Sequence, residues 1–485
     1  MDALWLLAPE YVLVAAAFLV FTVDLLLPEG RRHLTALVAA IGAAVTLGVA
    51  LATGMSLPPN GQLGTVFDVV VVDAYAVFFK VVFLAAVLLL IGTSYHYVRL
   101  TLRHPGEFYA ILLLATLGMN LLAASIELLT AYIALELMSF SFYVLAGYAK
   151  LNPKSNEAAI KYILMGAFSS AILLYGLSYV YGTAQVTFFG GLAAALAPFG
   201  TENVGVLFGL ILIVAGLGFK VSAVPFHQWA PDVYEGAPIP VTAFLSVASK
   251  MAAFALFLRL FVQAFLPILP LWQNLLIALA AASMIVGNLI ALRQSNLVRL
   301  LAYSSIAQVG YVLVGLAALT PDAGRFVAAG IVFHLVGYAI TNLAAFAVII
   351  AVWNVDGKQG IADFAGLSKR APYAALVMTV ALFSLAGLPF FAGFFTKFYL
   401  FTAAVAAGQL WLVAFAVLNS FVSLYYYLQV IRQMYAQEPA QPGHLPVPPL
   451  LSGVLTVLLA GMIWLGVYPT PVIQLIEGAV GTILR

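Results

Sequence analysis

Four charged residues stand within long hydrophobic stretches of the sequence: Glu136, Lys220, Lys250 and Lys397. A charge at the centre of a membrane span costs about 2.5 to 3.5 kcal/mol on insertion scales. These side chains must therefore form ion pairs, contact water or face an internal cavity. Lysine suits proton transfer because burial lowers the pKa of a lysine, whereas a nearby carboxylate raises it. The pattern predicts a buried row of groups that passes protons.

A structural role is the alternative for Glu136 and Lys220, which would then form an ion pair that only holds two helices together. A buried ion pair is often no more stabilising than apolar packing. Because Lys250 and Lys397 are two further lysines inside hydrophobic stretches, a shared function explains the set better than a single staple.

Three more residues are weaker candidates for the same pathway. Lys161 lies one turn into its predicted helix, where its side chain either extends to the membrane surface or feeds the pathway. His227 and His334 are able to relay protons near neutral pH, although a single histidine in a helix bundle is more often a packing residue. Lys80 and Arg259 lie where their long side chains can reach an interface, and both are interpreted as structural. Asp24 and Glu127 lie close to span ends and are expected to contact solvent.

The composition is that of a membrane protein. Of 485 residues, 64% are hydrophobic and 8% are charged, and the mean hydropathy is +1.10. A net charge of +2 argues against a nucleic-acid partner. The sequence contains no cysteine, which excludes disulfides and cysteine-ligated zinc or iron–sulfur sites. We therefore expect no metal and no redox cofactor in this chain.

The hydrophobic pattern predicts an all-α integral membrane fold, because a helix needs about 20 apolar residues to span the hydrocarbon. The first stretch, from Tyr11 to Leu27, is interpreted as a span and not as a cleaved signal. A Gly/Ala-rich segment at about 184–200 is too short to span and is predicted to be interfacial. About fourteen helices are predicted, at 9–27, 34–54, 74–97, 108–124, 126–149, 157–181, 204–235 (broken), 240–265, 269–292, 299–319, 325–353, 372–408 (broken), 409–435 and 447–468.

The basic residues of the loops predict the orientation, because loops rich in Lys and Arg stay in the cytoplasm. Alternate loops contain Arg31, Arg32, Arg99, Arg103, Lys150, Lys154, Arg293, Arg299, Lys358, Lys369, Arg370 and Arg432. The other side has Arg325 and the terminal Arg485. Both termini are therefore predicted to face away from the cytoplasm.

Two similar segments place a proline inside a long hydrophobic stretch: KVSAVPF at 220–226 and SLAGLPF at 384–390. Proline interrupts the helix, and broken helices in corresponding positions indicate an ion pathway in a transporter built from repeats. A kink that serves only packing is the alternative. The predicted organisation is an N-terminal unit at 1–107, two repeated five-helix units at 108–265 and 266–436, and a C-terminal helix at 437–485.

The motif HQWAPDVYEGAP at 227–238 resembles the antiporter-like membrane subunits of complex I, the proton-pumping NADH:quinone oxidoreductase, and among them the N type. Four more segments carry the resemblance: YIALEL at 132–137, EAAIKY at 157–162, RLLAYSSIAQVGY at 299–311 and LPFFAGFFTKF at 388–398. Many relatives have a histidine where this chain has Gln308, so a histidine relay at this point is in doubt.

The resemblance implies a fourteen-helix fold in which the two five-helix repeats are inverted. It also implies a proton channel in which Glu136 is the carboxylate, Lys220 its partner, Lys250 the connecting lysine and Lys397 the lysine of the second break. It also implies a multi-pass subunit of the bacterial plasma membrane that assembles with other membrane subunits. Flavin, iron–sulfur clusters, NADH and quinone would be bound by partner subunits. The alternative is a subunit of a multisubunit cation/proton antiporter with the same fold, and a purely structural membrane scaffold is disfavoured by the buried lysines.

Overall fold

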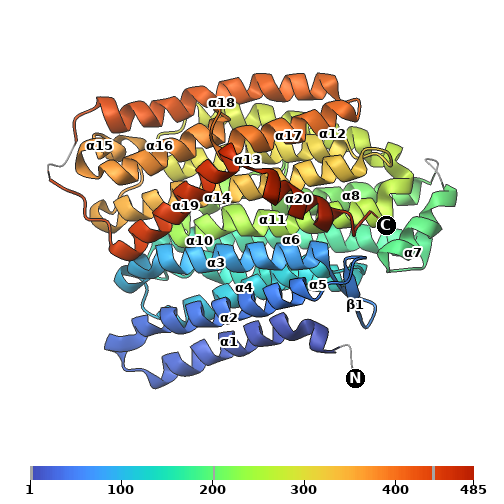
Figure 1. The fold of residues 1–485 in the computed structure, drawn as a ribbon, viewed down its shortest axis with the longest axis horizontal. Helices are drawn as coiled ribbons and strands as arrows, with labels where there is room; N and C mark the ends of the chain where they lie inside the picture. Colours follow the sequence, from blue (N-terminus) through green and yellow to red (C-terminus); the bar gives the residue numbers. More distant parts are fainter. Residues whose placement is uncertain (1–3, 200–202, 440–442, 485) are drawn as a thin grey trace.

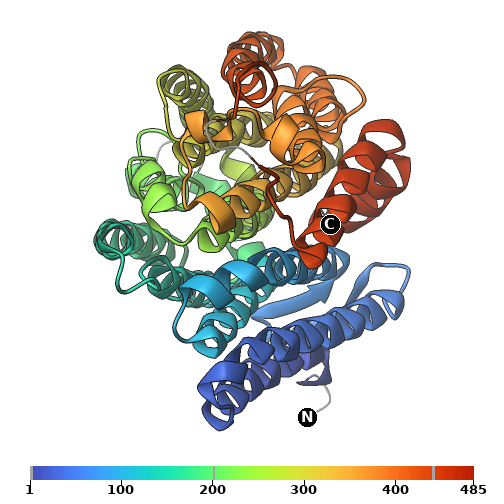
Figure 2. The same ribbon diagram turned by 90° about the vertical axis from the view of Figure 1, so that its left-hand side faces the viewer.

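The computed structural model describes residues 4–199, 203–439 and 443–484. Long helices lie side by side along one direction, which is horizontal in Figure 1, and short helices and turns join them at the two ends. Seen from one end in Figure 2, the N-terminal helices form the lower edge of the bundle and the C-terminal helices lie along the right side. This arrangement is the all-α bundle that the hydrophobic pattern predicts.

The first part of the chain contains η1 (Leu4–Leu7), α1 (Ala8–Leu26), η2 (Glu29–Leu34), α2 (Thr35–Met55), β1 (Gln62–Val66), β2 (Val70–Asp73), α3 (Ala74–Thr101), α4 (Pro105–Ala124), α5 (Leu128–Ala146), α6 (Pro153–Ala184), α7 (Phe189–Leu196) and η3 (Ala197–Phe199). The middle contains α8 (Val204–Val221), α9 (Trp229–Gly236), α10 (Ile239–Phe244), the π-helical turn η4 (Leu245–Ser249), α11 (Lys250–Leu260), the π-helical turn η5 (Phe261–Phe265), η6 (Leu266–Ile268), α12 (Leu269–Ala291) and α13 (Leu297–Ala317). The last part contains α14 (Gly324–Asp356), η7 (Ile361–Phe364), α15 (Leu367–Arg370), α16 (Pro372–Ala386), α17 (Ala392–Ala406), α18 (Leu410–Ala436), α19 (Pro449–Val467) and α20 (Thr470–Val480).

Among the described residues, 12 helical runs are long and apolar enough to cross a membrane. One of them, Ile239–Ala291, has 53 residues, which would measure roughly 80 Å as one straight helix and is far longer than a hydrocarbon core of about 30 Å. The broken stretch α16–α17 consists of two shorter apolar helices. The multi-helix membrane fold is confirmed, whereas the count of fourteen spans stays a prediction.

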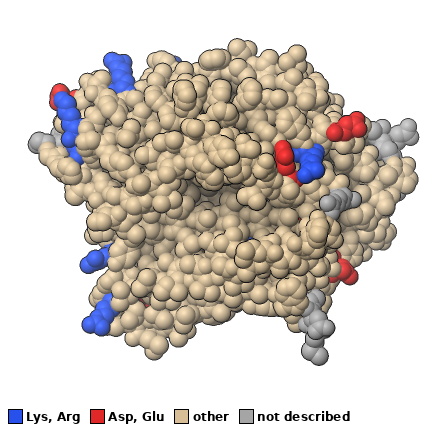
Figure 3. Space-filling view, viewed as in Figure 1, with Lys and Arg blue, Asp and Glu red and all other residues tan. Residues whose placement is uncertain are grey.

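The charged side chains of the visible face lie near its two ends. In Figure 3 most Lys and Arg side chains of this face lie at the left end, and the broad middle surface carries neither acids nor bases. Large apolar side chains are exposed on the outside of the bundle, among them Phe168 (74%) and Phe421 (67%). Lipid tails provide the apolar surroundings that such a surface needs. The apolar outer surface of the bundle is thus suited to a lipid bilayer.

Both predicted helix breaks are present. α8 ends where Ser222 adopts a left-handed conformation (φ 64°), and α9 begins seven residues later at Trp229. α16 ends at Ala386 and is followed by Gly387, which is also left-handed (φ 87°), and α17 begins at Ala392. A Cβ on Gly393 would collide with the carbonyl oxygen of Ser384, so this position needs glycine for the close approach across the break.

Two elements are additions to the sequence prediction. An antiparallel hairpin, β1–β2, pairs Gln62 with Asp73 and lies between α2 and α3. The helix α20 follows the last predicted span. The Gly/Ala-rich segment forms the eight-residue helix α7, which is too short to cross a membrane, and its interfacial position stays a prediction.

The two ends of the chain lie at the same end of the bundle. α1 begins and α20 ends at the right of Figure 1, whereas α15 lies at the left. Since the cationic loops lie opposite the termini, we expect a reporter fused after Arg485 to be non-cytoplasmic and a tag beside Lys369 to be cytoplasmic. Protease protection of the two tags in oriented vesicles checks this. Both tags on one side would contradict the arrangement.

Candidate functional site

Lys220 occupies the last turn of α8, immediately before the first break. Its side chain is buried, and its ammonium donates a hydrogen bond to the Ser139 hydroxyl at 2.8 Å. The hydroxyls of Tyr143 and Ser170 lie 3.4 and 3.5 Å from the same nitrogen. Hydroxyl groups of α5 and α6 therefore surround the amine, and each of them is able to accept and donate a proton.

Glu136 lies on α5, and a serine stands between it and Lys220. The Ser170 hydroxyl donates to Glu136 Oε1 at 2.6 Å, whereas the Lys220 nitrogen is 3.8 Å from the same oxygen. The Glu136 side chain is 15% exposed, compared with 3% for Lys220. The two charges are close enough to influence each other strongly. A short movement of either side chain would switch between a direct ion pair and a serine-bridged contact.

Lys250 lies at the start of α11, directly after the π-helical turn η4. Its ammonium donates to the Ser305 hydroxyl at 2.7 Å, and the Tyr234 ring centre is 5.7 Å away. Among the described residues, no carboxylate lies within ion-pair distance of this nitrogen. A permanently charged and unpaired ammonium is costly in such surroundings. The position suits a group that takes up a proton and passes it on.

Lys397 lies in the second turn of α17, directly after the second break. Its ammonium donates to the Leu385 carbonyl at 2.8 Å and to the Ser420 hydroxyl at 3.1 Å. The carbonyl is one that the end of α16 leaves without a partner inside its own helix. Lys397 also borders a cavity of about 230 Å³ between α17 and α18. The break thus supplies both an acceptor for the ammonium and space beside it.

The helix α13 connects the surroundings of Lys250 with those of Lys397. Ser305 contacts Lys250, and three residues further on Gln308 donates to the Leu385 carbonyl at 3.1 Å. This is the carbonyl that also accepts from Lys397. The Tyr311 ring centre lies 4.8 Å from the Lys397 nitrogen. One face of α13 therefore presents a row of polar side chains that extends from Lys250 to Lys397.

The weaker candidates have different surroundings. His334 is buried, and its Nδ1 lies 3.2 Å from the Thr396 hydroxyl, next in sequence to Lys397. His227 lies within the first break, between α8 and α9, and is half-buried. Lys161 is 41% exposed and forms ion pairs with Glu157 and Asp232, both at 2.7 Å. The structure therefore puts His334 beside a main candidate and Lys161 at the surface.

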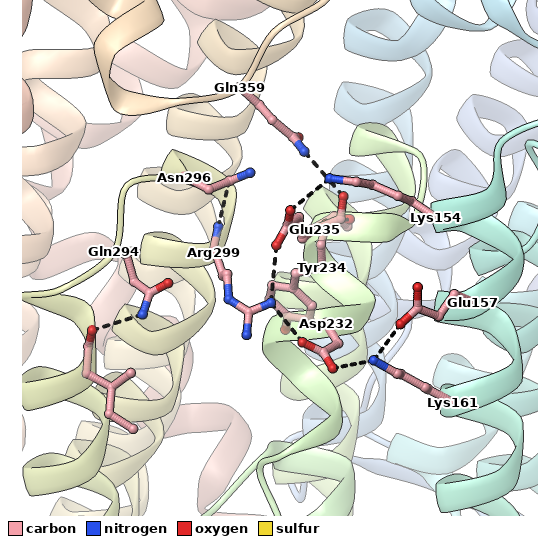
Figure 4. Close-up of polar contacts among 12 residues, drawn as sticks. Lys154, Glu157, Lys161, Asp232, Tyr234, Glu235, Gln294, Asn296, Arg299 and Gln359 are labelled. Atoms are coloured by element: carbon pink, nitrogen blue, oxygen red, sulfur yellow. Dashed lines mark hydrogen bonds and ion pairs between the residues drawn. The ribbon is translucent and has the colours of Figure 1, made fainter.

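Six charged residues form a network at one end of the bundle, and Figure 4 shows them between α6, α9 and α13. Arg299 contacts Asp232 at 2.7 Å and Glu235 at 3.1 Å, and Lys154 contacts Glu235 at 3.1 Å. With Glu157 and Lys161 these residues line a pocket of about 170 Å³. Sequence reasoning assigned Lys154 and Arg299 to loops and Lys161 to a helix, but it missed their acidic partners, although Asp232 and Glu235 lie within the motif at 227–238.

Four other charged residues near span ends are buried in the bundle, and two of them, Lys80 and Arg259, form ion pairs. Lys80 pairs with Glu10 at 2.7 Å with both side chains buried, and Arg259 forms two hydrogen bonds to Asp73, each at 2.8 Å. This agrees with the structural role predicted for both residues, although their side chains end on buried acids of neighbouring elements and not at an interface. Such pairs are costly to break because one charge would remain buried alone.

Asp24 and Glu127, which were expected to contact solvent, are also buried. Glu127 caps the N-terminus of α5 and accepts from the backbone of Leu129 and Thr130 at 3.0 and 2.6 Å. Burial raises the pKa of Glu127, but these hydrogen bonds outweigh it and leave the pKa below its usual value. Helix capping therefore explains this acid.

Among the described residues, no group of three or more His, Asp or Glu side chains is arranged to hold a metal ion. The chain matches the family model described as NADH:quinone oxidoreductase/Mrp antiporter, transmembrane, over residues 124–423. The chain belongs to this family. The matched range includes Glu136, Lys220, Lys250 and Lys397, whereas the buried pair of Glu10 and Lys80 lies outside it.

Curated relatives in this family match almost the whole chain. A protein of Moorella thermoacetica named NADH-quinone oxidoreductase subunit N is 44% identical, covering 97% of this chain and 97% of the relative. A protein of the same name from Desulforamulus reducens is 40% identical, covering 99% of this chain and 98% of the relative. The similarity therefore extends beyond the matched range to the N-terminal and C-terminal helices.

Solved structures of several chains have a similar fold. A chain of respiratory complex I from Thermus thermophilus with bound Aureothin is 31% identical with a TM-score of 0.79, covering 96% of this chain and 98% of that one. A chain of the archaeal membrane-bound sulfane sulfur reductase is 27% identical with a TM-score of 0.87, covering 100% and 98%. A chain of the Mrp complex from Dietzia sp. DQ12-45-1b has a TM-score of 0.87 at 21% identity, covering 100% and 98%, and shows likeness of fold alone.

Proposed function

We propose that this chain is a proton-translocating membrane subunit of an NADH:quinone oxidoreductase, in the bacterial plasma membrane. The buried lysines carry this proposal. Lys220, Lys250 and Lys397 are each enclosed in the bundle and each hydrogen-bonded to a serine hydroxyl. The names of the relatives support the assignment of the oxidoreductase. The energy for translocation would come from redox chemistry in partner subunits that bind NADH, flavin, iron–sulfur clusters and quinone.

The proposed path has two halves that correspond to the repeats at 108–265 and 266–436. In the first half a proton is held between Glu136 and Lys220, with Ser170 as the bridge. Lys250 then receives it and passes it along α13 towards Lys397. Removing or restoring the negative charge of Glu136 changes how firmly the Lys220 ammonium is held. Conformational changes in neighbouring subunits would act on this balance.

The proposed membership is tested by purifying the tagged chain from its membrane under mild conditions. We expect it to copurify with other membrane subunits and with a peripheral arm that contains flavin and iron–sulfur clusters. The purified assembly should reduce quinone with NADH and, in vesicles, translocate protons. Copurification with membrane antiporter subunits alone, without NADH oxidation, would contradict the proposal and support the cation/proton antiporter.

A further inference from the structure

The ion network at the end of the bundle joins two parts of the proposed path (Figure 4). Asp232 and Glu235 lie on α9, the second half of the first broken helix, and Arg299 lies in the first turn of α13. A single guanidinium nitrogen, Arg299 Nη1, contacts Asp232 at 2.7 Å and Glu235 at 3.1 Å. The Arg299 side chain is 29% exposed. Partial burial of a three-member cluster makes it stronger than an isolated surface ion pair.

The side of α9 that faces away from Asp232 and Glu235 contacts the surroundings of Lys220 and Lys250. The Trp229 indole donates to the Phe219 carbonyl at 2.9 Å, next in sequence to Lys220. The Tyr234 ring is buried and lies 5.7 Å from the Lys250 nitrogen. A shift or rotation of α9 would therefore change the surroundings of both amines together.

The helix α13, on the other side of the ion network, contacts the surroundings of Lys250 and Lys397. From Arg299 at its start, the same helix presents Ser305 to Lys250 and Gln308 to the carbonyl that binds Lys397. In the most hydrophobic stretch of α13, 94% of the residues are buried inside the bundle. A tightly packed helix of this kind transmits a displacement of its end because the interior has little room to absorb it.

We propose that Asp232, Glu235 and Arg299 are positioning residues that hold α9 against α13 and thereby align the first half of the proton path with the second. We call these three residues the α9–α13 clamp. They do not carry the proton themselves. The clamp sets the position of Ser305 and Tyr234 around Lys250, the point where the two halves meet. This inference rests on the proposed proton translocation and adds to it how the halves are kept in register.

The test measures protons translocated per NADH oxidised in vesicles, normalised to assembled complex. Arg299→Met and Asp232→Asn should each lower this ratio about threefold or more, while NADH oxidation continues. Arg299→Lys should retain at least half of the parental ratio, since an ammonium is also able to contact both acids. Lys154→Met is the matched control, because it removes a basic residue of the same network that does not contact α13.

The outcomes separate the clamp from the proposed function. If Arg299→Met and Asp232→Asn keep the parental ratio while Lys250→Met loses it, the clamp is wrong and the proton path stands. If Lys250→Met also keeps the ratio, the proposed function fails as well. An Arg299→Lys variant as defective as Arg299→Met would also overturn the clamp. Should Arg299→Met fail to assemble, the nearly isosteric Asp232→Asn variant decides the question by the same ratio.

Discussion

Lys397→Met should reduce proton translocation about tenfold or more, the scale expected for loss of a proton-transfer group, while the complex still assembles. Methionine keeps the apolar stem but has no titratable group. The lysine nitrogen donates to the Leu385 carbonyl and the Ser420 hydroxyl, and among the described residues it has no acid within ion-pair distance. Removing an unpaired buried ammonium does not leave an opposite charge behind. The Lys397→Met complex should therefore remain stable although it no longer transfers protons.

Lys397→Arg separates charge from proton exchange. Arginine keeps a positive charge beside the second break but holds its proton too firmly to exchange near neutral pH. We therefore expect both variants to lose translocation. The cavity of about 230 Å³ beside Lys397 gives the larger guanidinium room to fit.

The measurement is proton translocation driven by NADH in vesicles, with the amount of assembled complex determined for each variant. Lys369→Met is a suitable control because this lysine is 56% exposed and pairs with Glu438 at the surface. It should translocate at the parental ratio. If Lys397→Met and Lys397→Arg translocate protons at the same ratio as the Lys369→Met control, Lys397 is not an obligatory proton carrier. The proposed path through the second broken helix is then wrong.

Glu136→Gln should also lower translocation strongly, by about tenfold. Glutamine keeps the size and still accepts the hydrogen bond from Ser170, but it removes the negative charge 3.8 Å from the Lys220 nitrogen. Glu136→Asp keeps the charge and should preserve much of the activity. The order expected is parental, then Asp, then Gln.

Ser170→Ala distinguishes the bridge from the direct pair. It removes the hydroxyl that contacts both Glu136 and Lys220, and we expect an intermediate loss if the serine carries the proton between them. All three variants are compared by protons per NADH in the same vesicles. Normal ratios for both Glu136→Gln and Glu136→Asp would reduce the pair to a structural staple.

The broad architecture followed from the sequence because the bilayer imposes it. Lipid cannot hydrogen-bond a polypeptide backbone, so lipid-exposed spans must be helices of a minimum length, and such lengths are visible in the hydrophobic pattern. The two breaks were predictable for a different reason, because proline inside a helix removes a backbone donor and clashes with the preceding turn. Lys220 and Lys397 could be placed beside these breaks from spacing alone.

The partners of these residues were decided by tertiary structure. Ser170 lies between Glu136 and Lys220. Ser305 accepts a hydrogen bond from Lys250, which is 55 positions earlier in the sequence. Such contacts depend on how each helix is rotated about its own axis and how closely neighbouring helices approach. A hydrophobic span that is apolar on nearly all sides gives little indication of its rotation.

The same limit explains why the acidic partners of two other buried charges were not predicted. Arg259 and Asp73 are 186 residues apart in sequence yet form a buried pair, and Lys80 meets Glu10 from another helix. A position near a span end shows only that solvent is within reach, whereas packing of the adjacent elements determines whether the side chain uses it. The sequence therefore determined which residues are costly to bury, and only the fold decided which groups compensate that cost.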